Sequence, residues 1–380
     1  HWGRTPLLHH AGESAFEGLL GLADVDGLVT ETLLRMPSFR LVKDGKPVDP
    51  ATYTRTIRIG SRPVDRTIRP DRVLDAFADG ATIVLQALHR LRGPVGAFCR
   101  GLELDLTHPV QANAYVTPAS ARGFALHHDT HDVFVLQTHG RKRWRVHRPL
   151  VELPGREQPW SPAMGAPGPP VIEAELAAGD ALYIPRGFLH EAEAQAETSI
   201  HVTVGVLALT WLDLWRRVMA RAPQHVRFRE ALPPGFAGDP RLVEDELPAR
   251  AKELHAWLDE VLEDEAASFT GSFWRKRRPM LAGQMRQLDL AASMDATTAV
   301  HRRGGSVFVV AVNDDRATVL LGHRELRMPA FVEPALRFVE TATEAFTAAD
   351  VSGGLDEASR LVLLRRLVRE GALEILDDGG

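Results

Sequence analysis

Hydrophobic and polar positions alternate with a period of two through the middle of the chain, from about residue 95 to residue 208. The alternation recurs in "QANAYVTP", "DVFVLQTHG", "KRWRVHRP", "DALYIPRG" and "SIHVTVGVLAL", and Gly and Pro separate these segments. This period is typical of β-strands, because successive side chains point to opposite faces of a sheet. Many short strands with tight turns predict a closed or sandwich-like β-barrel.

The flanking segments show the helical period instead. Residues 14–37 are expected to be helical, and residues 69–91 are expected to form one helix that ends near Gly80 and then a second helix. After Thr210 the segments "WLDLWRRVMARA", "LPARAKELHAWLDEVLEDEAASF" and "PMLAGQMRQLDLAA" predict a helical bundle.

A last module begins near His301. Two alternating segments flank residues 313–315, which predicts a hairpin, and a helix that Asp356 can cap follows them. This order of elements resembles a winged-helix unit. The pattern therefore divides the chain into a barrel part with N-terminal helices (1–208), a helical region (209–300) and a winged-helix-like domain (301–380).

Composition adds limits on location and partners. The 380 residues are 44% apolar and carry a net charge of −5, which favours no polyanionic partner. The single cysteine, Cys99, excludes an internal disulfide and a Cys-rich zinc site, so we expect a cytoplasmic protein. No apolar run is long enough to span a membrane. Residues 301–380 hold ten Arg, no Lys and thirteen acidic residues, so we expect no DNA binding there.

The stretch "HHDTHD" contains the first candidate metal ligands. His127 and Asp129 are two positions apart on an expected strand, so their side chains point to the same face and can grip one ion. His128 points to the other face. His131 shares the face of His127 but lies further along. We therefore expect neither His128 nor His131 to be a ligand.

A third ligand is expected from "GDALYIPRGFLH". The spacing of Gly179, Pro185, Gly187 and His190 matches the second motif of the cupin superfamily, in which a tight turn reverses the chain before the histidine. His201, in the strand-like "SIHVTV", is the rival for this role. We prefer His190 because the turn positions it.

Two imidazoles and one carboxylate on one side of an ion leave its other side open. This is the facial triad of non-haem Fe(II) oxygenases, whereas a structural zinc site is closed by four protein ligands. Imidazole suits Fe, Zn, Cu and Ni alike, so the ligands alone do not choose the metal. Three open positions allow a bidentate co-substrate and O₂ to bind together.

The usual co-substrate of such a site, 2-oxoglutarate, needs a cation for its distal carboxylate. Strand parity puts Lys142 on the apolar, inner face with Trp144, and a lysine buried there is costly unless it meets an anion. A protein carboxylate is the alternative partner for this lysine. On "NAYVTP", Asn113 and Tyr115 share one face with Thr117 and can donate hydrogen bonds.

Together these motifs resemble the JmjC-type cupin family of ribosomal oxygenases, which are Fe(II)- and 2-oxoglutarate-dependent protein hydroxylases. The resemblance also covers "HWGRTPLL" at the start, the helical region and the final module. It implies a double-stranded β-helix (jelly-roll) barrel, a helical dimerisation region and a C-terminal winged helix. By position it implies His127, Asp129 and His190 as metal ligands, Lys142 for the distal carboxylate, and co-substrate contacts from the set Asn113, Tyr115, Ser199 and His201. The family often reads Ser-Thr-His where this chain has "SIH", so the last two roles are left open.

The resemblance implies hydroxylation of a protein or peptide side chain, such as an arginine or histidine of a ribosomal protein. Alternatives are a peptide natural product or small molecule as acceptor, a metal-dependent cupin enzyme without 2-oxoglutarate, and demethylation by the same chemistry. A homodimer is expected, because the helical region offers large apolar side chains: Trp211, Leu214, Trp215, Leu258 and Leu262. A bundle packed within one chain explains these side chains as well.

Overall fold

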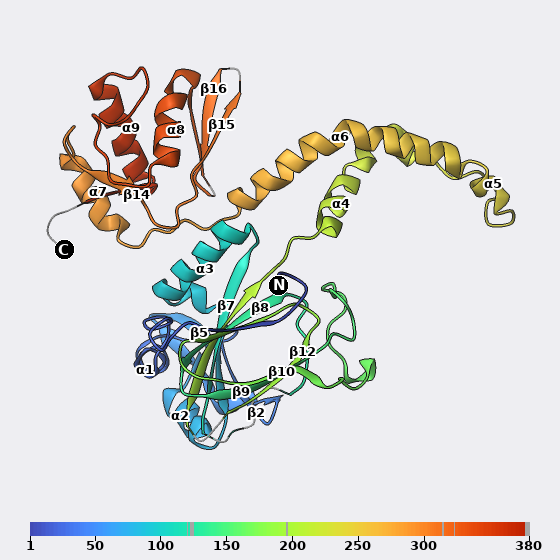
Figure 1. Cartoon of the computed structure of the whole chain (residues 1–380), viewed down its shortest axis with the longest axis vertical. Helices are drawn as coiled ribbons and strands as arrows, with labels where there is room; N and C mark the ends of the chain where they lie inside the picture. Colours follow the sequence, from blue (N-terminus) through green and yellow to red (C-terminus); the bar gives the residue numbers. More distant parts are fainter. Residues whose placement is uncertain (120, 122–124, 195–196, 314, 323, 377–380) are drawn as a thin grey trace. The chain divides into compact units, whose positions relative to one another are not determined.

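The computed structural model describes residues 1–119, 121, 125–194, 197–313, 315–322 and 324–376 (Figure 1). The chain forms two compact units, His1–Ala208 and Leu209–Gly380. A division of the second unit at residue 300 stays a prediction. Within the described residues, no helix has both the length and the apolar character that a membrane crossing requires.

The first unit is built on two antiparallel sheets that form the barrel. The larger sheet has the order β1 (Leu7–His10), β11 (Asp180–Ile184), β8 (Asp132–His139), β13 (Ser199–Val206), β7 (Val110–Thr117), β6 (Thr82–Leu85), β2 (Phe39–Lys43) and β3 (Lys46–Pro47). The smaller sheet has the order β10 (Pro170–Leu176), β9 (Lys142–His147) and β12 (Leu189–Ala194). The predicted β-barrel is therefore confirmed.

Helices and a hairpin surround these sheets. They are α1 (Leu22–Glu31), α2 (Pro70–Ala78), α3 (Gly93–Leu106) and the β4–β5 hairpin (Thr54–Ile59 and Arg62–Ile68). One apolar cluster joins the helices to the outer face of the large sheet, and it includes Ala114 of β7 and Val202 of β13. A second cluster fills the space between the sheets, with Val135 and Trp144 among its members. The alternate residues of β7 and β13 therefore face the barrel interior, where the site lies.

Two predictions about the N-terminal elements are wrong. Residues 82–85 form strand β6 instead of a second helix, because all four side chains are buried and the strand is paired on both sides, with β2 and β7. A short, continuously apolar run cannot be told from a buried helix by its period. Residues 14–19 form turns, and the helix spans only Leu22–Glu31 within the range 14–37.

The second unit contains the helices predicted after Thr210 and the predicted hairpin. Its helices are α4 (Trp211–Met219), α5 (Arg241–Glu244), α6 (Leu247–Arg275), α7 (Gln284–Ser293), α8 (Glu333–Thr341) and α9 (Glu357–Arg369). Its strands are β14 (Val300–Arg302) with β18 (Leu373–Ile375), and β15 (Val309–Asn313), β16 (Arg316–Leu320) and β17 (Glu325–Pro329) in sequence order. Asp356 caps α9 as expected, accepting a hydrogen bond from the Ser359 amide at 2.8 Å. Asp314, which belongs to the turn predicted from the sequence, lies outside the described residues.

Candidate metal centre

The segment that carries His127 and Asp129 is not a regular strand. It pairs at a single position, where His127 and His190 form an isolated antiparallel bridge. The two residues exchange backbone hydrogen bonds, His127 N to His190 O at 3.1 Å and His190 N to His127 O at 2.8 Å. The Gly187 amide adds a hydrogen bond to the Asp129 carbonyl at 3.0 Å. The expectation of a strand through residue 127 is thus wrong, and β8 begins only at Asp132.

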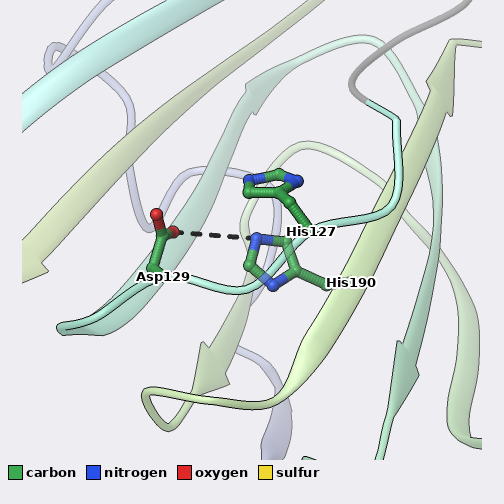
Figure 2. A group of neighbouring side chains, drawn as sticks. All are labelled: His127, Asp129 and His190. Atoms are coloured by element: carbon green, nitrogen blue, oxygen red, sulfur yellow. Dashed lines mark ion pairs between the residues drawn. The ribbon is translucent and has the colours of Figure 1, made fainter. Parts of the chain in front are cut away.

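Three potential ligand side chains converge here (Figure 2). One ligand atom from each of His127, Asp129 and His190 lies within 4.8 Å of the others. The His190 Nε2 is 3.7 Å from Asp129 Oδ2, and the two imidazole centroids are 4.3 Å apart. The spread of these atoms suits three ligands around one ion. His190, and not its rival His201, completes the set.

Backbone carbonyls orient both imidazoles. His127 Nδ1 lies 2.8 Å from the Ala125 carbonyl oxygen, and His190 Nδ1 lies 3.0 Å from the Phe188 carbonyl oxygen. Each carbonyl can accept only from a protonated Nδ1, so each Nε2 is unprotonated, which is the form that binds a metal. Burial and the neighbouring His127 lower the pKa of His190 to about 4. His190 is therefore neutral near pH 7, which is the metal-binding form.

The other two histidines of "HHDTH" lie outside this set. His128 is buried on the opposite side of the segment, where its Nε2 lies 3.2 Å from the Gln158 carbonyl oxygen and its ring meets Trp160 edge-on. His131 packs against Gly205, where an added Cβ would come within 2.6 Å of the imidazole. Among the described residues, the metal-type cluster comprises His127, Asp129 and His190.

A cavity opens beside the three side chains. Its walls also include Tyr115, Trp144, His201 and Thr203, together with Val133, Val135, Glu191 and Ala192. Burial, and then the negative charge of Asp129, raise the pKa of Tyr115 to about 12, so its hydroxyl stays protonated. Burial and the nearby Lys142 hold the pKa of His201 well below its usual value. Tyr115 and His201 stack at 5.0 Å between ring centroids.

Lys142 is completely buried on the inner face of β9, as strand parity predicts. Its Nζ donates a hydrogen bond to Thr117 Oγ1 at 3.1 Å. Burial lowers the pKa of Lys142 to about 7. Burial accounts for this shift, and no carboxylate of the described residues contributes to it. The alternative of a protein carboxylate partner is therefore wrong.

The remaining residues expected to touch a co-substrate have different surroundings. The Asn113 Oδ1 accepts a hydrogen bond from the Ala87 amide at 3.0 Å. Ser199 is buried, and its Oγ accepts a hydrogen bond from Gln137 Nε2 at 2.8 Å. The described cavity wall includes Tyr115 and His201 but not Asn113, Ser199 or Lys142.

Sequence reasoning left out several polar groups of the cavity wall, among them Trp144 and Thr203. The signal was available in both cases. Trp144 has the strand parity of Lys142, and Thr203 has that of His201. In the sequence, Trp144 serves only as an apolar residue that marks the inner face of the strand.

The part of the chain that carries this site matches known proteins. Residues 100–214 match the JmjC domain model. Ribosomal oxygenase 1 of Gallus gallus is 31% identical over 243 residues, covering 61% of this chain and 39% of the relative. Residues 100–214 thus carry a JmjC domain, and the chain resembles the ribosomal oxygenases. A second relative, the bifunctional lysine-specific demethylase and histidyl-hydroxylase NO66 of Dictyostelium discoideum, is 34% identical over 212 residues, covering 53% of this chain and 41% of the relative.

The fold comparison extends over both units. The crystal structure of the Escherichia coli ribosomal oxygenase YcfD matches with a TM-score of 0.54 and 22% identity, over 99% of this chain and 96% of that one. YcfD in complex with cobalt and 2-oxoglutarate matches with a TM-score of 0.53 and 21% identity, over the same shares. By contrast, the chain spans only 39% and 41% of the two JmjC relatives from Gallus and Dictyostelium.

Proposed function

We propose that this protein is an Fe(II)- and 2-oxoglutarate-dependent oxygenase that hydroxylates a side chain of a ribosomal protein. The observation that carries the proposal is the convergence of His127, Asp129 and His190 on one point, with ligand atoms within 4.8 Å of one another. The names of the relatives, ribosomal oxygenase and histidyl-hydroxylase, support the reaction and the class of substrate. The complex of YcfD with cobalt and 2-oxoglutarate supports the co-substrate.

The residues present fit such a metal. Two neutral imidazoles and one carboxylate would hold it from one side, and the cavity beside them would admit the other ligands. Bound iron would supply the activation of O₂ that hydroxylation of an unactivated C–H bond requires. The protein would position the reactants and limit the access of water.

Lys142 supports the choice of a dicarboxylate as co-substrate. A fully buried ammonium that donates a hydrogen bond to the Thr117 hydroxyl is destabilising without an anion, and an incoming carboxylate would compensate for its lost hydration. Ion pairing would also raise the pKa of Lys142 from about 7 towards its ordinary range. We therefore assign the distal carboxylate of 2-oxoglutarate to this side chain.

The test is the addition of Fe(II) and 2-oxoglutarate to the metal-free protein without oxygen. The wild type should develop a weak visible charge-transfer band, and His127→Ala should lose it. His128→Ala is the matched control, because His128 is adjacent in sequence but faces away from the site, and this variant should keep the band. If the wild type shows no band and forms no succinate in air with any ribosomal protein, the proposal is wrong.

The acceptor is tested separately. Intact-mass spectrometry of host ribosomal proteins, with and without the gene, should show one protein heavier by one oxygen atom. Loss of methyl groups from a lysine would instead favour demethylation, which the name of the Dictyostelium relative includes. An unchanged set of ribosomal proteins, together with intact 2-oxoglutarate turnover, would favour a peptide natural product or a small molecule.

A metal-dependent cupin reaction without 2-oxoglutarate makes a different prediction. It requires no anion at Lys142, so Lys142→Ala should leave activity and ligand affinity unchanged. Under our proposal the same variant should lose 2-oxoglutarate binding.

We also propose that the helical region forms a homodimer. Leu214, Leu258 and Leu262 pack around buried Trp257 within one chain, which accounts for three of the five large apolar side chains. Trp211 and Trp215 on α4 stay 76% and 41% exposed, and they support a partner surface. Sedimentation at two protein concentrations should show association that increases with concentration. Trp211→Ser should weaken this association.

The winged-helix assignment of the C-terminal module and the cytoplasmic location are further proposals. The module combines helices α8 and α9 with the three-stranded β15–β16–β17 sheet, an arrangement that supports the first. The free, buried Cys99 supports the second.

A further inference from the structure

Trp144 lies between the buried cation and the candidate metal ligands. On β9 the inward residues are Lys142, Trp144 and Val146, and Val146 is the cross-strand partner of His190. The three share one face of the strand, so a ligand that reaches from Lys142 to the metal ligands passes the side chain of Trp144. The indole ring is 6.2 Å from the His190 ring, between centroids.

The indole has an unsatisfied donor at this place. Trp144 is 5% exposed, and its Nε1 makes no hydrogen bond within the described part of the chain. The indole Nε1 can only donate, and a buried donor without a partner destabilises the folded protein. Trp144 is also part of the cavity wall. A purely apolar filler such as Phe would occupy the same position without this cost.

His201 provides a second unsatisfied atom opposite Trp144. Its ring meets the indole edge-on, with centroids 5.3 Å apart and planes at 85°. His201 is 2% exposed, lines the same cavity, and its Nδ1 has no hydrogen-bond partner among the described residues. Two buried polar atoms without partners thus border one cavity, on the path between Lys142 and the metal ligands.

We propose that the Trp144 indole is a binding residue for the co-substrate, donating a hydrogen bond from Nε1 to one of its carboxylate oxygens, with His201 Nδ1 as the neighbouring polar contact. This inference rests on the proposed 2-oxoglutarate-dependent function, and it adds a hydrogen-bond donor to the proposed co-substrate site. A carboxylate oxygen satisfies the indole because it is an acceptor and carries charge, which strengthens the hydrogen bond. The class of ligand is a short dicarboxylate that Lys142 holds at its other end.

The direct test is the ¹⁵N–¹H spectrum of tryptophan-labelled protein loaded with diamagnetic Zn(II). The chain has seven tryptophans, and the Trp144→Phe variant identifies the indole signal of Trp144 by its absence. Addition of 2-oxoglutarate to the wild type should move this signal downfield, as expected when a free N–H gains a hydrogen bond to an anion. The signal of exposed Trp211 should not move.

Calorimetry provides the second measurement. Trp144→Phe keeps an aromatic ring against His201 but removes the donor, and it should bind 2-oxoglutarate about 10-fold or more weakly. Trp160→Phe is the matched control, because this tryptophan packs against His128 and is not part of the described cavity wall. It should bind 2-oxoglutarate with the wild-type affinity.

The outcomes are distinguishable. If 2-oxoglutarate binds the wild type but leaves the Trp144 signal in place, the indole only packs and the inference is overturned, even if Trp144→Phe binds weakly. Equal affinities of Trp144→Phe and the wild type overturn it as well. If Zn(II) binds but 2-oxoglutarate does not bind the wild type at all, the proposed function fails together with the inference.

Discussion

His127 and His190 are held together by the main chain: each donates its backbone N–H to the carbonyl of the other, at 3.1 and 2.8 Å. The bridge brings the ring centroids to 4.3 Å although the residues are 63 positions apart in sequence. The Asp129 carbonyl is held in turn by the Gly187 amide at 3.0 Å. The turn before β12 therefore holds Asp129, while β12 itself carries His190 and holds His127.

We expect the metal affinity to depend on this trio and not on the neighbouring histidines. His127→Ala and His190→Ala should each weaken Co(II) binding at least 100-fold. Each substitution leaves two protein ligands instead of three, so the site loses a donor atom and its coordination geometry. Titration of the metal-free protein with Co(II), followed by visible absorption, measures this.

His131→Ala serves as the control for the metal titration, since His131 packs against Gly205 outside the cluster. It should bind Co(II) within a few-fold of the wild type. Wild-type affinity in His190→Ala would show that a different set of residues binds the metal.

The metal-free protein should lose stability as the pH falls from about 6.5 to about 4. The folded-state pKa of His190 is about 4 and its ordinary value is 6.5, so in this window the unfolded chain binds a proton that the folded chain does not. The free energy of unfolding should fall by at most about 1.4 kcal/mol per pH unit from this residue. Urea unfolding in the presence of a chelator measures the slope.

His190→Gln should make that slope shallower, because the glutamine does not titrate. His255→Gln changes an exposed side chain on α6 and should leave the slope as it is. An identical slope in His190→Gln and the wild type would contradict the assignment of the low pKa.

Lys142→Met should stabilise the protein at pH 7 by about 1–4 kcal/mol while it abolishes 2-oxoglutarate binding. The folded-state pKa of Lys142 is about 7, well below its ordinary value of 10.5, so wild-type stability rises with pH between these values. The variant lacks this dependence. Urea unfolding at pH 7 and pH 9, with calorimetry of 2-oxoglutarate, tests both parts, and exposed Lys46→Met is the control. A variant that is destabilised at both pH values would show that Lys142 has an anionic partner within the protein.

Gly187→Ala should destabilise the protein by about 1–3 kcal/mol and weaken metal binding. Gly187 has φ +88°, and a Cβ there would lie 2.6 Å from the Val151 carbonyl oxygen and 2.7 Å from Pro154 Cδ. Relief of this clash would displace the amide that holds Asp129. Gly101→Ala is the control, because this residue lies inside α3 with open space around it. Alanine there should raise the free energy of unfolding by about 0.5–1 kcal/mol. Equal stability of the two variants would contradict the tight-turn argument.

Strand parity was the most productive local signal. It put Lys142 and Trp144 inside, and both are buried on one face of β9. It failed for β6, where a central strand with both faces covered shows no alternation. It also misjudged the segment at His127, which is no regular strand and bridges at one residue only.

The sequence by itself determined the local features: the alternating strands, the His127–Asp129 pair, the glycine and proline turn before His190, and the inward side of Lys142. These depend on periodicity and turn chemistry, which act over a few residues. Only the tertiary structure decided that His190 and not His201 joins the pair, that Lys142 lacks a carboxylate partner among the described residues, and that Trp144 lies between cation and ligands. Those relationships depend on the register between strands far apart in the chain, which no local pattern specifies.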